Sequence, residues 1–189
     1  MGQVWHERGG VLLAVLAGLP LLVLLTAVLA RHRRDAATPA ESWRRSVAEV
    51  GAVAGTLPWV WMVLTPRPAP RGVDLVPLHD LVDLLTGSPA YAVIQVVGNL
   101  LVFAAFGFFA PVRLAALAGV GRLFLLGAAG SVLIEAAQYV LDLGRVSSID
   151  DVLLNAAGAA LAGLLSRRWW AGRRPAPARP AAAPATPRG

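Results

Sequence analysis

Several acidic and amide side chains lie within stretches of sequence that are otherwise apolar, and their spacing is helical. Ser131, Glu135, Gln138 and Asp142 fall at offsets of 0, 4, 7 and 11 residues. On an α-helix these offsets share one face, so the four residues form a continuous polar stripe. Ionisable and amide groups are costly inside a membrane and usually face the interior of a helix bundle. The stripe is therefore a candidate functional site.

Two other apolar stretches carry polar side chains at the same helical spacing. Gln95 and Asn99 form an i,i+4 pair. Asp151 and Asn155 form another. At about 1.5 Å per residue, Glu135 lies about 9 Å from the nearer end of its apolar stretch, Asn155 about 5 Å and Asn99 about 13 Å. We therefore expect three helices to offer polar groups at overlapping depths.

The connection between the last two apolar stretches adds an arginine to this set. Arg145 is close enough in sequence to reach Glu135 or Asp142 on one side, or Asp150 on the other. Its guanidinium is suited to a carboxylate, or to a phosphate on a ligand. We predict a ligand pocket made from seven residues: Asn99, Glu135, Gln138, Arg145, Asp150, Asp151 and Asn155.

The residues around the start of the last apolar stretch also have a structural interpretation. Ser148 followed by Asp151 is typical of a capping box, and aspartates there favour the positive N-terminus of a helix. Asp150 could serve only as such a helix cap. Gly158 is a position typical of close helix packing.

The polar stripe could likewise serve only to hold helices together. Glu135 would then pair with Arg145, and Gln138 with Asn155. Such interhelical contacts are common in membrane bundles. Both interpretations stay open at the level of the sequence.

The elements that must position these residues are transmembrane helices. Of the 189 residues, 57% are hydrophobic and only 15% are charged, with a mean hydropathy of +0.63. A soluble domain carries about a quarter charged residues, so we expect a lipid bilayer as the solvent. We predict an all-α, polytopic bundle of about five spans. They are Val11–Ala30, Val47–Leu64, Ala90–Ala110, Leu123–Leu141 and Val152 to about Trp170.

The basic residues set a direction for these spans. All are arginines, and the loop over residues 31–46 holds the densest cluster, which follows the first span at once. This pattern favours an uncleaved span over a signal peptide. The positive-inside rule places the loop in the cytoplasm, so we expect the N-terminus outside the cell and the C-terminus inside. Arginines beside apolar spans indicate anchoring rather than nucleic-acid binding.

Three parts follow from this layout. Residues 1–72 form two anchor helices with a basic loop, residues 73–170 form the polar membrane domain, and residues 171–189 are a Pro/Ala/Arg-rich tail that we expect to be disordered. The segment Val73–Leu85 has apolar residues at helical spacing but is too short to span, so we predict a helix on the outer interface. It contains His79, a lone histidine near Asp83.

Several of these stretches together resemble the VanZ-like family. Its marks are an asparagine-containing apolar segment ending in F-x-G-F, then E-x-x-Q, G-R and D-D-x-x-x-N-x-x-G, in this order across roughly residues 73–166. The matching stretches are Gly98–Phe103 with Phe106–Phe108, Ile134–Gln138, Gly144–Arg145 and Ser148–Gly158. The entry segment departs from the family pattern, with Asp74 where Asn is usual and Leu78 where Phe is usual.

The resemblance implies a small protein of the bacterial cytoplasmic membrane. The family's named member is linked to low-level resistance to the glycopeptide antibiotic teicoplanin. The resemblance supports a membrane location and the polar site for this chain more directly than it supports teicoplanin resistance.

Three functions are compatible with the sequence. A non-enzymatic envelope protein would bind a lipid-linked or peptidoglycan-related ligand, or a glycopeptide, in an outward-facing pocket. A membrane enzyme would act on a lipid-linked phosphate or glycan, with paired acids on Mg²⁺ and Arg145 on phosphate. A transporter is disfavoured by the absence of repeats and of a broken-helix pair. The absence of cysteine excludes thiolate chemistry, and we favour binding over catalysis, with no cofactor and no resident metal.

Overall fold

The computed structural model describes residues 18–33, 38–87 and 89–171. The parts of the predicted first span, of the basic loop and of the tail that fall elsewhere lie outside the described residues. The elements in chain order are α2 (Pro39–Val63), β1 (Gly72–Asp74), α3 (His79–Thr86), α4 (Pro89–Val102), α5 (Ala104–Arg113), η1 (Ala115–Leu117), α6 (Val120–Val140), β2 (Val146–Ser148), α7 (Ile149–Ser166) and η2 (Arg167–Trp169).

The predicted class, a polytopic helical membrane bundle, is confirmed. Four helical stretches are long and apolar enough to cross a membrane, and a shorter apolar helix precedes them. The four are Pro39–Val63, Pro89–Arg113, Val120–Val140 and Ile149–Trp169, and the shorter helix is Gly18–His32. The chain is therefore a multi-span membrane protein.

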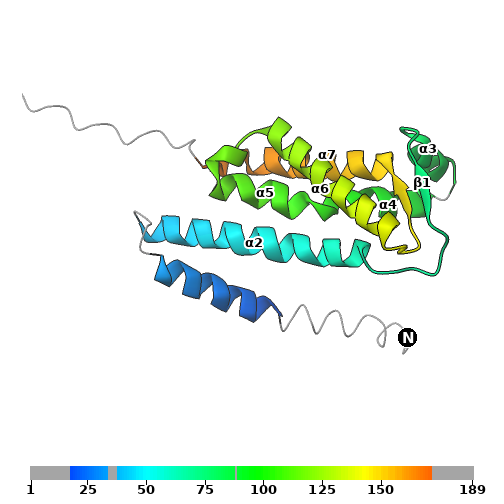
Figure 1. The fold of residues 1–189 in the computed structure, drawn as a ribbon. Coiled ribbons are helices and arrows are strands. Elements are labelled where there is room, and N and C mark those ends of the chain that lie inside the picture. The colour runs from blue at the N-terminus through cyan, green and yellow to red at the C-terminus, as the bar shows by residue number, and fades with distance from the viewer. Residues whose placement is uncertain (1–17, 34–37, 88, 172–189) are drawn as a thin grey trace, which may run out of the picture.

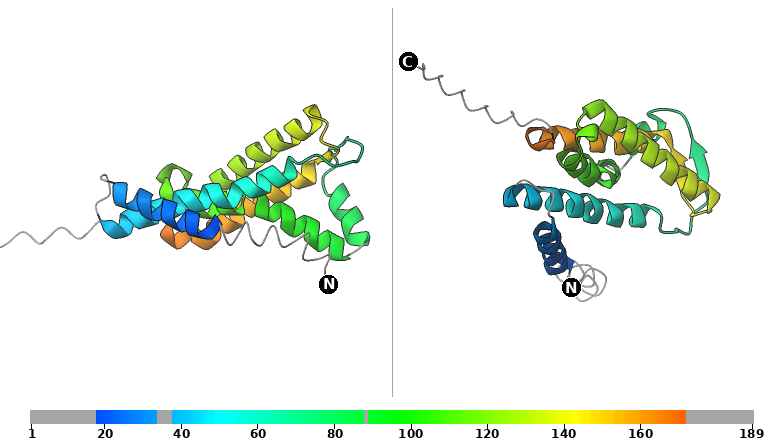
Figure 2. Two further views of the ribbon diagram at one scale, coloured as in Figure 1. Left: turned by 90° about the horizontal axis from the view of Figure 1, so that it is seen from below. Right: turned by 60° about the vertical axis from the view of Figure 1, so that its left-hand side comes forward.

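The long helices run side by side along the length of the molecule (Figure 1). α7 packs against α4, α5 and α6, and α2 lies mainly along α5. The shorter helix Gly18–His32 lies on the side of α2 that faces away from α5 (Figure 2). The three-helix group around α7 is thus the packed centre of the fold.

Small residues allow α7 to approach its neighbours closely. A Cβ atom at Gly158 would lie 2.0 Å from the carbonyl oxygen of Leu100, and one at Gly107 would lie 2.0 Å from that of Ala159. Neither separation is possible between real atoms, so glycine is required at both positions. The packing role predicted for Gly158 is confirmed.

The third span is broken into two helices. α4 ends at Val102 and α5 begins at Ala104, with Phe103 between them at φ −111° and ψ 10°. The backbone N–H of Gly107 donates to the carbonyl of Phe103 at 2.9 Å, which restarts the helical pattern. The sequence predicted one continuous span here, because the run of apolar residues carries no signal for the interruption.

A two-stranded parallel sheet replaces part of the predicted interfacial helix. β1 pairs with β2 in the register Gly72↔Val146 and Asp74↔Ser148. The helix predicted over Val73–Leu85 is therefore wrong in its first part, and α3 covers only His79–Thr86. Leu78 separates the two parts with a positive φ of 66°, a conformation that interrupts a right-handed helix. The pairing of β1 with a distant segment could not be read from local spacing.

The two ends of the bundle differ in character. We call the end with β1, β2 and α3 the sheet end. The opposite end is the arginine end, which is defined by Arg31, Arg33, Arg44, Arg45, Arg113, Arg122, Arg167 and Arg168. There, Glu49 of α2 forms ion pairs with Arg33 and with Arg113 of α5. These pairs join the shorter N-terminal helix, α2 and α5.

Candidate functional site

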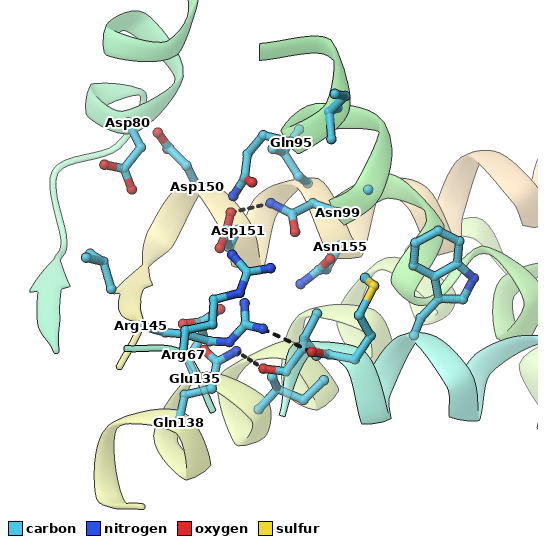
Figure 3. Close-up of a pocket in the computed structure, with 18 of the residues that line it drawn as sticks. Arg67, Asp80, Gln95, Asn99, Glu135, Gln138, Arg145, Asp150, Asp151 and Asn155 are labelled. Carbon is cyan, nitrogen blue, oxygen red and sulfur yellow. Dashed lines mark hydrogen bonds between the residues drawn. The ribbon is translucent and has the colours of Figure 1, made fainter. Parts of the chain in front are cut away.

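A cavity of about 1040 Å³ opens at the sheet end, between α2, α4, α6 and α7 (Figure 3). All seven residues that the sequence nominates line it: Asn99, Glu135, Gln138, Arg145, Asp150, Asp151 and Asn155. The helical spacing had placed Asn99, Glu135 and Asn155 at overlapping depths, and the fold brings all seven residues to one cavity. Three further polar residues line the same cavity: Arg67, Asp80 and Gln95.

Asn99 and Asp151 connect α4 to α7 across the cavity. The Asn99 side chain is 9% exposed, and its amide nitrogen donates to the carboxylate of Asp151 (Figure 3). This bond leaves the second carboxylate oxygen of Asp151 for another partner. The Asn99 amide thus orients an acid that stands on the first turn of α7.

Glu135 holds the start of α7 from the neighbouring helix. Its carboxylate accepts from the backbone N–H of Ser148 at 3.3 Å, and its backbone carbonyl accepts from the hydroxyl of Ser147 at 3.0 Å. Ser148 is the N-cap of α7, and its hydroxyl accepts from the N–H of Asp150 at 3.1 Å. The predicted capping role of Ser148 is confirmed.

The second hydrogen bond of a capping box, which the backbone N–H of the N-cap residue donates, has an unexpected acceptor here. In a capping box the third residue of the helix, here Asp151, would accept from the N-cap N–H. Glu135 accepts it instead, and Asp151 is bonded to Asn99. The helix start is therefore satisfied without Asp151, which is directed to the cavity.

Asp150 fastens the segment before α3 to α7. It is 4% exposed, and its carboxylate accepts from the backbone N–H of Leu78 at 2.6 Å. This bond fixes the residue with positive φ that separates β1 from α3. Asp150 thus has a structural task besides its place on the cavity wall.

Gln138 and Arg145 are bonded to the last turn of α2 and to Thr65, which follows it. The Gln138 amide donates to the carbonyl of Val63 at 2.9 Å, and the Arg145 guanidinium donates to those of Met62 at 3.0 Å and Thr65 at 3.3 Å. Among the described residues, neither alternative pair, Glu135 with Arg145 or Gln138 with Asn155, is joined by a direct hydrogen bond. The last carbonyls of a helix have no partner within it. The carbonyls at the end of α2 can therefore accept from the side chains of Gln138 and Arg145.

Two buried polar atoms on the cavity have no hydrogen-bond partner among the described residues. Asn155 is 3% exposed, and its amide nitrogen donates to the hydroxyl of Ser131 at 2.7 Å while its Oδ1 has none. The Nε of Arg145 is the second such atom. A buried polar group without a partner costs about 1–3 kcal/mol. Both residues line the cavity, but the two atoms themselves are covered by neighbouring protein atoms.

Two arginines lie close together on one side of the cavity. Burial lowers the pKa of Arg145 from its usual range, and the positive charge of Arg67 lowers it further. Gly144 makes this approach possible, because its φ is +63° and a Cβ there would lie 2.0 Å from the carbonyl oxygen of Arg67. The Gly-Arg motif therefore has a physical basis: the glycine lets the chain pass against Arg67.

A second polar group lies at the rim. The Nδ1 of His79 is 2.5 Å from a carboxylate oxygen of Asp74, and this hydrogen bond lowers the pKa of Asp74. With Asp80 they form a group whose ligand atoms lie within 4.8 Å of one another, a spacing that could hold a cation. The sequence places His79 near Asp83, and in the structure His79 is bonded to Asp74 at the end of β1.

The sequence did not nominate the three further lining residues. Gln95 carried a signal, since it stands one helical turn before Asn99. Arg67 and Asp80 belong to the connection after α2 and to α3, and only the folding of these segments over the bundle brings them to the cavity.

The fold and site define a multi-span helical membrane protein with a polar cavity at one end. The model of the VanZ/LLP1 family matches residues 52–170, more than half of the chain, and the chain belongs to this family. The match begins within α2, earlier than the resemblance at residue 73 suggested. Among curated proteins and solved structures, none matches this chain.

Proposed function

We propose that the cavity faces the outside of the cell and binds the polar part of a lipid-linked or peptidoglycan-related envelope ligand. The observation that carries the proposal is the gathering of two guanidinium groups, those of Arg67 and Arg145, and the carboxylate of Asp151 on one cavity. A ligand that offers acceptors to the arginines and a donor to Asp151 would make hydrogen bonds to both kinds of charge at once. Such complementarity orients a ligand as well as stabilising it.

The direction follows from charge. Under the positive-inside rule the arginine end lies in the cytoplasm, which places the sheet end and the cavity outside. The chain would then enter the membrane with its N-terminus outside and leave its C-terminus in the cytoplasm.

The charges in the cavity favour a phosphorylated ligand. Arg67 and Arg145 form a pair of guanidinium groups suited to phosphate or diphosphate oxygens. Asp151 supplies carboxylate oxygens that can accept from the hydroxyl or amide groups of an attached sugar or peptide. A protein that holds a cell-wall precursor in this way would change how teicoplanin reaches its target, which is the route by which the family would affect glycopeptide susceptibility.

A second candidate is an enzyme that hydrolyses a lipid-linked phosphate at the same site. The observation in its favour is that Asp80 belongs both to the cavity and to the group with Asp74 and His79. Acids at this rim could hold a divalent cation that neutralises the phosphate.

The two candidates are tested with Glu135→Gln and Asp151→Asn, expressed at equal levels in the membrane. Asp142→Asn is the matched control, because its carboxylate is 66% exposed at the same end and does not line the cavity. Each variant is assayed for teicoplanin susceptibility and for hydrolysis of undecaprenyl diphosphate. A change in susceptibility without hydrolysis supports binding, whereas hydrolysis lost in the cavity variants supports the enzyme. Wild-type behaviour in both assays would overturn the cavity as the functional site.

A further inference from the structure

One side of the cavity is open between α2 and α4. α2 packs along α5 and has little contact with α4. The α4 side chains that line this opening are well exposed, with 69% for Ile94 and 47% for Val97. On the α2 side the lining residues are Trp59 and Met62. The opening therefore has apolar walls and leads to a polar floor.

The opening extends to the depth of hydrocarbon. The cavity lining continues along α4 as far as Leu101, about 18 Å from Pro89 at the sheet end. A bilayer has a hydrocarbon core about 30 Å thick, so this part of the wall meets lipid tails rather than water. The polar floor, with Asn99 and Asp151, is reached from the same side.

We infer that this opening holds the hydrocarbon chain of a membrane lipid whose phosphate headgroup lies at Arg67 and Arg145. The inference rests on the proposed function and decides between its two ligand sources in favour of a lipid-linked one. The lipid would enter sideways from the outer leaflet, between α2 and α4, without leaving the bilayer. A water-soluble phosphate would need no apolar walls at that depth.

The continuity of the lining separates this opening from the ordinary lipid-facing surface. Leu133 on α6 is 71% exposed but does not line the cavity. Ile94 on α4 is exposed to nearly the same degree and does line it. A chain lying against Ile94 can therefore be connected to a headgroup in the polar cavity, whereas a chain lying against Leu133 cannot.

The test uses the full chain in phosphatidylcholine vesicles with two probes that carry the same photoreactive diazirine in a polyprenyl chain. One probe ends in a phosphate and the other in the alcohol. Cross-linked peptides are mapped by mass spectrometry. We expect the phosphate probe to label α2 and α4 at the opening at least fivefold more than the alcohol probe, with equal labelling of the two probes around Leu133.

Two bulky variants test where the hydrocarbon chain of the lipid lies. Ile94→Trp, which narrows the opening, should remove most of the excess labelling by the phosphate probe, and Leu133→Trp should leave it unchanged. Retention of each probe by the intact protein, measured by native mass spectrometry, reports headgroup binding separately. If the protein retains the phosphate probe preferentially but both probes label the opening equally, the proposed site for the hydrocarbon chain is overturned while the proposed function stays intact. Equal retention of both probes would overturn the proposed function and this inference together.

Discussion

The carboxylate of Glu135 on α6 accepts a hydrogen bond from the backbone N–H of Ser148, the N-cap of α7, at 3.3 Å. An acid from a neighbouring helix thereby supplies a bond that helices usually make within their own first turn. The start of α7 is fixed to α6, and Asp151 stays available to the cavity. The E-x-x-Q and D-D motifs are thus parts of one arrangement.

This bond predicts different effects for two substitutions of Glu135. Glu135→Gln keeps an acceptor oxygen and should retain most of the stability of the fold. Glu135→Leu leaves the Ser148 N–H without its partner, which should cost about 1–3 kcal/mol. Thermal unfolding of the purified variants in detergent, together with hydrogen exchange at the Ser148 amide, measures the difference. Equal stability of the two variants would show that the bond contributes nothing.

Gly144 predicts a separate way to disturb the site. Its φ of +63° costs about 1–2 kcal/mol for a residue with a Cβ, and that Cβ would lie 2.0 Å from the carbonyl oxygen of Arg67. Gly144→Ala should therefore displace the loop that carries Arg145 and abolish preferential binding of a phosphate lipid. Binding is measured by native mass spectrometry.

The matched control for that substitution is Gly72→Ala in β1. A Cβ at Gly72 would lie 3.4 Å from a methyl group of Val146, which is ordinary contact. This variant should bind as the wild type does. Wild-type binding by Gly144→Ala as well would contradict the proposed importance of the arginine pair.

The type and approximate positions of the long helices could be predicted from the sequence because lipid imposes a simple rule, although α2 begins at Pro39, within the predicted loop, rather than at Val47. Apolar runs of about twenty residues must form helices that satisfy their own backbone. The same helical spacing placed Glu135 and Gln138 on one face, and both line the cavity. This prediction of a shared face succeeded because its cause, the helical repeat, lies within a single helix.

The partners of those residues could not be predicted, because they come from backbone groups far away in the chain. Gln138 is bonded to the carbonyl of Val63 and Asp150 to the N–H of Leu78. From the sequence, Asn155 was the expected partner of Gln138, and Asp150 could have served only as a helix cap. The sheet was missed for the same reason, since β1 and β2 become strands only by meeting each other.

The bonds of Gln138 and Arg145 to α2 predict that its last turn is held from across the cavity. Pro58 lies in α2 one turn before these carbonyls, and a proline lacks the N–H that would stiffen the helix there. Gln138→Leu should therefore speed hydrogen exchange at the amides of Leu64 and Thr65 by about tenfold, while exchange in the first half of α2 stays unchanged. Gln95→Leu, which removes another amide from the cavity lining, is the control. Unchanged exchange in Gln138→Leu would show that packing alone holds this turn.

Adding a phosphate lipid tests whether the ligand shares this contact. A phosphate at Arg145 competes with the carbonyls of Met62 and Thr65 for the same guanidinium. Exchange in the last turn of α2 should then rise on binding in the wild type. Slower exchange would indicate that the ligand closes the cavity rather than loosening its wall.

The orientation of the bundle decides whether any of this chemistry faces the cell wall, and the chain is well suited to a direct test. It contains no cysteine, so single-cysteine variants report one position each. Val76 is 61% exposed at the sheet end, and Ala116 is exposed at the arginine end. Both side chains are uncharged, so a cysteine at either position removes no ion pair. In intact cells a membrane-impermeant maleimide should label Val76→Cys but not Ala116→Cys, and it should label both after lysis. The reverse pattern would place the cavity in the cytoplasm, where its arginine pair would meet soluble phosphates and the link to envelope precursors would be lost.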